Sequence, residues 1–180
     1  SNPVPLPEPV NSTADEFYPS VTKSGSIYFT RMVKGKGEDI VYCKWNNKVF
    51  EPAISLPDVI NTSGDEFNAF VDPDEQFVIY TGYKRKDALG TGDLYISKKN
   101  EQGEWTASVN LGNAINGAGL TYCPYISPDK KYFFFSSSRN SIIKTPFEKQ
   151  QTITELKQLI NQPLNGWDNI YWIDASQFFK

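Results

Sequence analysis

The stretch LPDVINTSGDEF (56–67) is repeated without a gap 55 positions later as LGNAINGAGLTY (111–122), and this repeat decides the fold. A third copy, LPEPVNSTADEF (6–17), lies 50 positions upstream of the first. All copies share an asparagine and an aromatic residue at fixed places: Asn11, Asn61 and Asn116, then Phe17, Phe67 and Tyr122. Repeats with periods of about 20–50 residues indicate stacked or radial architectures.

Each copy is followed by a segment with the pattern strand, turn, strand: 21–30, 71–81 and 126–136. The second and third segments carry a Pro-Asp pair at the turn, where proline presets φ and aspartate hydrogen-bonds to its own backbone. The first segment has Lys23-Ser24-Gly25 instead. Aromatic and β-branched residues flank the turns, as half-buried strands require. Three β-hairpins are therefore predicted.

Further strands complete each repeat unit. A third strand is predicted over 39–43, 93–97 and 169–173, and a fourth over 49–54 and 104–109. The units span about 11–61, 61–116 and 116–180, and 1–10 is a fourth strand of a neighbouring unit. We expect one all-β domain over 1–180 with four-stranded antiparallel units.

The order of a Ser-Pro-Asp turn, an aromatic strand ending in Ser or Thr, an arginine, and then Asp-Ile/Leu-Tyr resembles the WD40-like PD40 repeat of TolB-like β-propellers. Residues 126–139 and 93–97 match it best. The resemblance implies four-stranded blades around a central channel. It also implies a periplasmic or extracellular protein, with any export signal removed, that serves as a binding platform or as a scaffold beside an enzyme domain.

Three units fall short of the roughly four to eight blades that close a propeller, so the chain corresponds to half of a six-bladed ring. Two explanations stay open. The chain is a C-terminal portion of a six-bladed parent, or two copies form a homodimer around a two-fold axis, and we predict the homodimer. In the dimer, each N-terminal strand completes the last blade of the other copy by strand exchange and covers its free sheet edge.

A short helical insertion near 152–162 interrupts the third unit. Apolar residues at 153, 156, 159 and 160 have helical spacing, and Thr152 with Glu155 forms a capping box. The helix ends before Pro163. Its apolar stripe is expected to pack against the last blade, with a lid over the channel as the functional alternative.

Composition excludes several classes of function. The chain has no histidine, which excludes Ser-His-Asp and Cys-His catalysis and imidazole metal sites. The net charge of −3 gives no reason to expect a nucleic-acid partner, and no apolar run approaches the roughly 20 residues of a membrane span. Cys43 and Cys123 lack metal-ligand spacing and are interpreted as small buried side chains. No cofactor and no metal are predicted.

The candidate ligand-binding residues are expected at one mouth of the channel: Glu16, Glu66 and Tyr122 where the innermost strands begin, and Arg31, Arg85 and Arg139 on the loops after the second strands. The acidic pair is placed to act as acid and base or to cap the turn of each blade, and the capping role is favoured because the two positions are repeated. The arginines are placed to bind an anionic ligand or to form ion pairs within the blade with Asp39, Asp93 or Asp168. No catalytic residue is assigned.

Weaker signals have local explanations. The sequons at Asn11 and Asn61 fall on the repeated asparagine, where backbone hydrogen bonding is expected instead of glycosylation. The acidic run 72–75 is interpreted as a hairpin turn and not as a calcium loop. Trp105 aligns with Phe50 and is assigned to packing, which leaves Trp45 and Trp167 as the aromatic residues free to stack on sugars.

Two classes of function remain. The leading one is a non-catalytic binding module for a protein, peptide or glycan, because the acidic residues mostly follow the repeat and catalysis requires convergent, non-repeated polar groups. The alternative is the propeller portion of a carboxylate-dependent glycoside hydrolase or lyase, or the companion propeller of a hydrolase.

Overall fold

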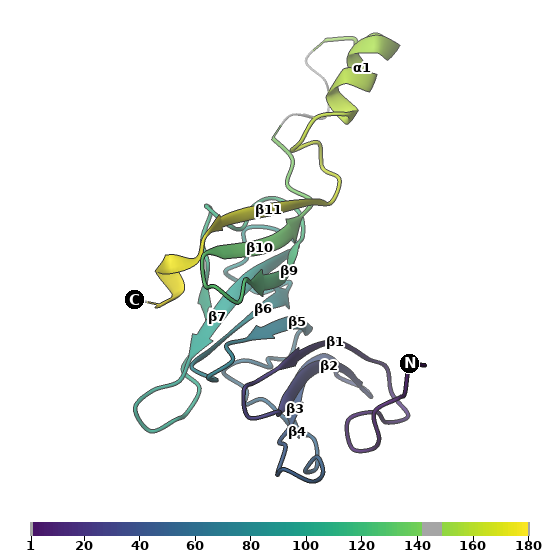
Figure 1. Cartoon of the computed structure of the whole chain (residues 1–180). Helices are drawn as coiled ribbons and strands as arrows, with labels where there is room; N and C mark the ends of the chain where they lie inside the picture. Colours follow the sequence, from purple (N-terminus) through teal and green to yellow (C-terminus); the bar gives the residue numbers. More distant parts are fainter. Residues whose placement is uncertain (1, 142–148, 180) are drawn as a thin grey trace.

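The structure, a computed structural model, describes residues 2–141 and 149–179, which form three antiparallel β-sheets in chain order (Figure 1). The first sheet has the order β1-β2-β3-β4, with β1 (Glu16–Val21), β2 (Ile27–Val33), β3 (Gly37–Cys43) and β4 (Ile54–Ser55). The second has the order β5-β6-β7-β8, with β5 (Glu66–Val71), β6 (Phe77–Tyr83), β7 (Gly92–Lys98) and β8 (Val109–Asn110). The third has the order β11-β10-β9, with β9 (Thr121–Ile126), β10 (Tyr132–Ser137) and β11 (Asn169–Asp174). The all-β prediction is confirmed, and the described sheets do not close into a ring.

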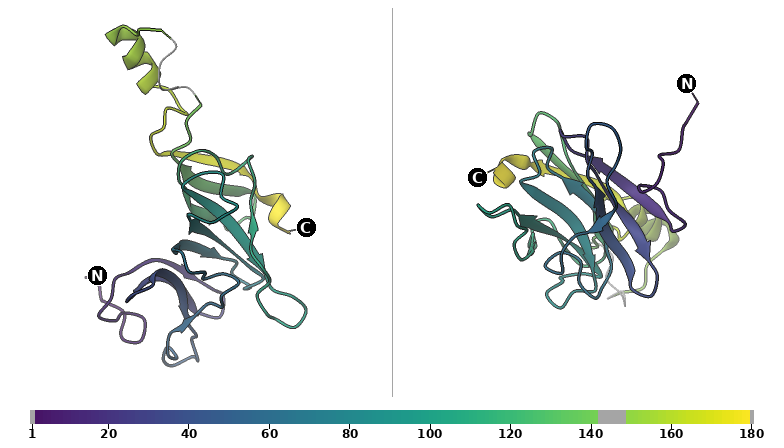
Figure 2. Two further views of the ribbon diagram at one scale, coloured as in Figure 1. Left: turned by 180° about the vertical axis from the view of Figure 1, so that it is seen from behind. Right: turned by 90° about the horizontal axis from the view of Figure 1, so that it is seen from below.

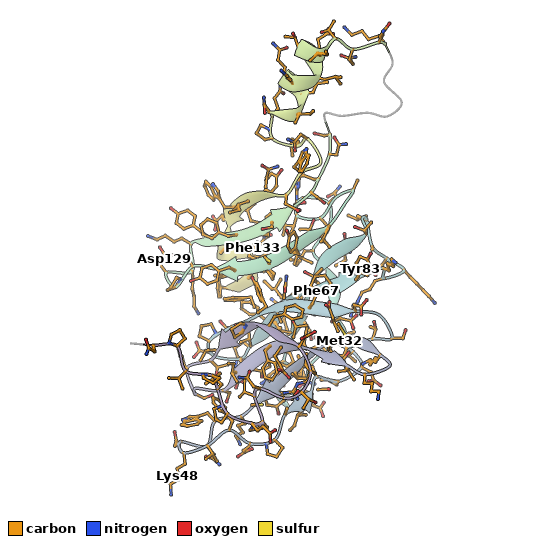
Figure 3. All side chains as sticks on the ribbon, turned by 90° about the vertical axis from the view of Figure 1, so that its right-hand side faces the viewer. Met32, Lys48, Phe67, Tyr83, Asp129 and Phe133 are labelled. Atoms are coloured by element: carbon orange, nitrogen blue, oxygen red, sulfur yellow. The ribbon has the colours of Figure 1, made fainter. Side chains whose placement is uncertain are left out.

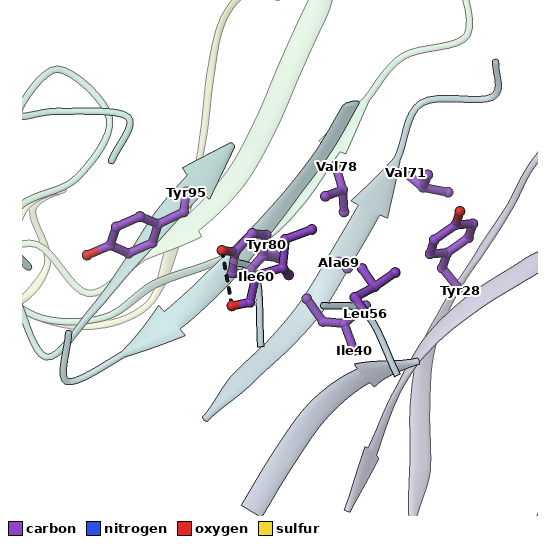
Figure 4. Close-up of a cluster of buried hydrophobic side chains, with 9 residues drawn as sticks. All are labelled: Tyr28, Ile40, Leu56, Ile60, Ala69, Val71, Val78, Tyr80 and Tyr95. Atoms are coloured by element: carbon purple, nitrogen blue, oxygen red, sulfur yellow. Dashed lines mark hydrogen bonds between the residues drawn. The ribbon is translucent and has the colours of Figure 1, made fainter. Parts of the chain in front are cut away.

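The sheets follow one another in space as they do in sequence (Figure 2), with β5 between β1 and β9. Buried apolar side chains fill the space between the first and second sheets (Figure 4), where the phenol of Tyr80 also donates to the carbonyl of Ile60. A second cluster joins the second sheet to the third and includes Phe178 of the 3-10 helix η1 (Ala175–Phe179). Each sheet is therefore held by the apolar face of its neighbour.

All three predicted hairpins form, since β1 pairs with β2, β5 with β6 and β9 with β10. Each connecting turn contains one residue with a left-handed backbone, namely Gly25, Glu75 and Lys130, with φ of 86°, 57° and 60°. The first turn lacks the Pro-Asp pair but has glycine at this position, where a side chain is disfavoured. The same turn geometry is thus reached by two different sequences.

The predicted fourth strands were placed too early. Strands β4 and β8 contain two residues each and begin at Ile54 and Val109. The residues before them instead fold back on the end of the third strand, through isolated bridges of Trp45 with Phe50 and of Lys99 with Trp105. Ring packing between Trp45 and Phe50, whose centroids lie 4.9 Å apart, favours this turn over a longer strand.

Helix α1 (Ile153–Ile160) confirms the predicted helix and its capping box, because Glu155 N donates to Thr152 Oγ1 and the Glu155 carboxylate accepts from Thr152 N. Its predicted packing is wrong. The helix projects away from the sheets (Figure 1), it buries no residue, and Ile153 is 74% exposed. No helix within the described residues is long and apolar enough to cross a membrane.

Candidate functional site

The first strands of the three sheets share a backbone irregularity. The pairing register of β1, β5 and β9 shifts at equivalent places, where Tyr18, Asn68 and Cys123 have φ of 54°, 53° and 54°. A left-handed conformation costs a residue with a side chain about 1–2 kcal/mol. Strained backbone that recurs at one place in a fold is characteristic of functional sites.

The three residues at these irregular positions meet although their types are not repeated. Asn68 Nδ2 donates to Cys123 Sγ at 3.2 Å, and the Tyr18 hydroxyl donates to the carbonyl of Pro124 at 3.1 Å. These three residues were not among the candidates predicted from the sequence. The available signal was that the aligned copies place tyrosine, asparagine and cysteine at one repeat position, directly after the shared aromatic residue.

Burial keeps the phenol and the thiol of this group neutral. It raises the pKa of Tyr18 far above its ordinary value, and the neighbouring Cys123 acts in the same direction. Burial also raises the pKa of the Cys123 thiol, although hydrogen bonds from Tyr18 and Asn68 oppose this effect. At neutral pH the group therefore offers uncharged hydrogen-bonding atoms.

A cavity of about 320 Å³ lies beside this group, toward the ends of the three first strands. Its walls are mainly aromatic residues and prolines: Tyr18, Phe70, Tyr125, Phe179, Pro19, Pro73, Pro124 and Pro128. The rings of Phe70 and Tyr125 pack edge to face at 5.9 Å, and Tyr125 remains 48% exposed. The volume is that of a site for a small ligand or for one group of a larger one.

Asp72 gives this cavity an unusual polar atom. The residue lines the cavity and is 2% exposed. Its Oδ2 accepts hydrogen bonds from the amides of Asp74 and Gln76, which hold the turn, whereas its buried Oδ1 has no partner within the described residues. An unpaired buried acceptor is costly, and this oxygen has almost no contact with solvent.

No protein-family model and no curated protein matches the chain.

The predicted acidic residues lie at the opposite ends of the first strands and are already paired. Glu66 is fully buried, accepts from Arg85 Nη2 at 3.0 Å and also accepts from the amide and hydroxyl of Thr62. Glu16 makes the equivalent contacts with Arg31 and Ser12. Burial pushes the pKa of Glu16 upward, but the Ser12 hydrogen bonds and the Arg31 ion pair outweigh it, and the pKa lies below its ordinary value.

The expected ion pairs of the arginines with third-strand aspartates are wrong. Asp39 pairs with Lys36, and Asp93 accepts from backbone amides and from Asn110. The arginines instead each donate to the carbonyl that precedes the repeated asparagine, joining Arg31 to Val10, Arg85 to Ile60 and Arg139 to Ile115. The side chains reach this carbonyl from different strand positions, which the spacing in sequence did not reveal.

The third sheet differs at the acidic position. Thr121 stands where Glu16 and Glu66 stand in the other copies, and its hydroxyl lies 3.1 Å from that of Ser137. Within the described part of the chain, Arg139 has no carboxylate partner and packs over the ring of Tyr171 at 4.7 Å. Tyr122 lies beside Asp168, and burial together with this carboxylate raises the pKa of Tyr122.

A second cavity of about 320 Å³ lies at this opposite end, lined by Met32, Glu38, Asp65, Phe67, Tyr83 and Leu120. Figure 3 shows that Tyr83 lies on the opposite side of the molecule from Asp129, which belongs to the turn beside the first cavity. Burial and the nearby Asp65 carboxylate raise the pKa of Glu38. No group of three potential metal ligands occurs among residues 2–141 and 149–179.

The remaining candidates have mostly structural surroundings. Cys43 is fully buried, as predicted, and both cysteines are free. Trp45, predicted to be available for sugars, packs on Phe50 instead. Trp167 is 67% exposed and lies outside both cavities.

Proposed function

We propose that the three sheets are blades of a β-propeller of the TolB-like PD40 type and that the chain is a non-catalytic, exported or periplasmic binding module. The support comes from the repeated strand order, from the sheet-on-sheet packing of successive units and from the quoted PD40-like motifs. Propellers bind ligands along the central axis that their innermost strands surround. The cavity beside β1, β5 and β9 corresponds to this place.

The aromatic wall of the cavity carries the proposal for the ligand. A group that fills this cavity must offer an apolar face to the half-exposed ring of Tyr125 and hydrogen-bonding groups to the polar residues of the wall, such as Ser20, Ser127 and Lys130. A sugar ring meets both demands, because its hydroxyl groups donate and its C–H face stacks on aromatic rings. We therefore favour a glycan as the ligand.

The contacts of the two repeated glutamates favour binding over hydrolysis. Each carboxylate accepts from an arginine and from a serine or threonine, and Glu66 has no exposed surface. A carboxylate that acts as an acid or base must reach the substrate. The glutamates are instead placed to hold the loops before β1 and β5.

A glycan array followed by titration calorimetry tests this proposal. Tyr125→Ala removes the half-exposed ring of the cavity wall, so we expect binding to weaken about tenfold or more, which is about 1.4 kcal/mol. Trp167→Ala, which removes a more exposed ring outside the cavity, serves as the matched control and is expected to bind like the wild type.

The same experiment separates the alternatives. Loss of binding in Trp167→Ala with normal binding in Tyr125→Ala would overturn the assignment of the cavity. Failure to bind any glycan would overturn the ligand class. Turnover of a bound glycan that Glu66→Gln abolishes, while the variant still folds, would establish the hydrolase alternative.

A further inference from the structure

The repeated asparagine fixes the third strand of each complete sheet. Asn61 Oδ1 accepts from the amide of Ile40 at 2.9 Å, and its Nδ2 donates to the carbonyls of Ile40 and Leu56 at 2.8 and 3.0 Å. Asn116 makes the same pair of contacts with Leu94, at 2.8 and 3.0 Å. In this way one side chain satisfies both backbone groups of a buried strand residue.

The N-terminal copy of this turn has the same shape but no strand to bind. We call residues 6–11, 56–61 and 111–116 the asparagine turns. In the first, Asn11 Nδ2 donates to Leu6 O at 2.8 Å, as Asn61 does to Leu56, and the amides of Val10 and Asn11 donate to Pro7 O. No donor to Asn11 Oδ1 occurs among residues 2–141 and 149–179.

The first sheet holds this turn in place. Val10 is 3% exposed and packs on the face of the first sheet that points away from the second, and Arg31 Nη2 donates to the carbonyls of Pro9 and Val10. Ile60, the equivalent of Val10, lies between the first and second sheets. The first asparagine turn is therefore positioned as if another sheet stood before the first.

Strand β11 is the third strand of a sheet that lacks this partner. By pairing register, Ile170 corresponds to Ile40 and Leu94, yet Ile170 is 78% exposed and the other two are fully buried. Trp172 and Tyr132, on the same face, are 61% and 40% exposed, with ring centroids 5.3 Å apart. No described strand pairs with the outer edge of β11.

We propose that residues 4–11 of a second copy of this chain bind to the outer edge of β11, with residues 4 and 5 as a fourth strand like β4 and β8 and with Asn11 of one copy binding the backbone of Ile170 of the other. By analogy with the pairs Tyr42–Ile54 and Ile96–Val109, Val4 then lies opposite Trp172. Pro5 falls opposite Tyr171, at a position where the strand N–H points away from its partner and proline is tolerated.

The number of copies follows from the blade count and rests on the proposed propeller. Two copies provide six sheets, within the four to eight that close a ring, whereas three copies would provide nine. In the two-fold dimer, both free edges of β11 and both exposed aromatic faces are covered. A second copy of the chain therefore fits as the occupant.

Mass and cross-linking test the dimer directly. Light scattering at micromolar concentration is expected to give twice the 20.4 kDa of one chain. In a mixing experiment, an affinity-tagged Val4→Cys variant and an untagged Trp172→Cys variant are expected to form a mixed disulfide under mild oxidation. A tagged Val49→Cys variant, whose valine is also exposed, is the matched control and is expected to form no such disulfide.

Two further variants keep the test independent of folding. Asn11→Ala removes one local hydrogen bond and is expected to lower the dimer population at least about tenfold while retaining the circular-dichroism spectrum. Ile170→Lys places a charge on the exposed edge and is expected to give folded monomers. A monomeric wild type, or a dimer that both variants leave unchanged, would overturn the strand exchange. Such a result would not decide the proposed function, which is tested separately by glycan binding.

Discussion

The carboxylate of Glu66 accepts hydrogen bonds from Nε and Nη2 of Arg85 at 3.2 and 3.0 Å, with its side chain entirely removed from solvent. Removing one partner of a buried ion pair leaves the other charge uncompensated. Glu66→Gln is therefore expected to lower the free energy of unfolding by about 3–5 kcal/mol, as measured by urea denaturation.

A surface pair supplies the control for this change. Asp74 pairs with Lys23, and both side chains are largely solvated. Asp74→Asn is expected to leave the urea midpoint unchanged, because exposed ion pairs contribute little. Equal losses for the two variants would contradict a structural role of the Glu66–Arg85 pair.

The asparagine turns predict a second, local effect. Asn116→Ala leaves the amide of Leu94 without its acceptor inside the protein. This change is expected to lower the free energy of unfolding by about 1–3 kcal/mol. Hydrogen exchange should show faster exchange of the Leu94 amide and of its neighbours in β7. Asn161→Ala, at the exposed end of α1, is the control, and exchange in β7 should not change.

The left-handed turn positions predict different costs for two glycines. Gly35 has φ of +80° and open space where a Cβ would lie. Gly35→Ala is therefore expected to lower the free energy of unfolding only by the backbone strain, about 1–2 kcal/mol. Gly25 has φ of +86°, and an added Cβ would lie 2.9 Å from Trp45 Cδ1. Gly25→Ala should therefore be measurably less stable to urea than Gly35→Ala, and the reverse order would contradict the packing of Trp45 at this turn.

The raised pKa of Cys123 predicts the pH dependence of its alkylation. Only the thiolate reacts, and burial disfavours it. The midpoint of the rate-against-pH curve with iodoacetamide, followed by peptide mass spectrometry, should lie above that of the urea-unfolded chain. Asn68→Ala removes a hydrogen bond that lowers the pKa and should move the midpoint further up, whereas Asn100→Ala, in a distant exposed turn, should not.

The repeat allowed the hairpins, the third strands and the asparagine positions to be predicted, because each depends on short-range turn chemistry and on strand alternation. The fourth strands were placed wrongly, since the packing of Trp45 on Phe50 and the contact of Lys99 with Trp105 override the local strand propensity of the residues around them. The spacing of α1 identified the helix but not its surroundings. An apolar stripe predicts a buried face only where a partner lies beside it.

The site was harder to predict because it depends on contacts between units. The equivalent carbonyls of Val10, Ile60 and Ile115 are reached by arginines from unequal strand positions, so spacing alone paired them with the wrong acids. The meeting of Asn68 with Cys123 joins residues of two sheets. Asp72 looked like an ordinary turn residue, and only burial shows that one of its oxygens is unpaired.

The proposed contact between the first asparagine turn of one copy and β11 of another joins two different surfaces of the chain, and it would therefore have a direction. Contacts of this kind either close on themselves or continue from molecule to molecule as a fibre. Any change that alters the angle between successive sheets, for example at the interface of Phe77 and Phe178, would then act on polymer length as well as on stability. If the proposed assembly forms, the packing that holds the third sheet would thus also determine whether assembly stops.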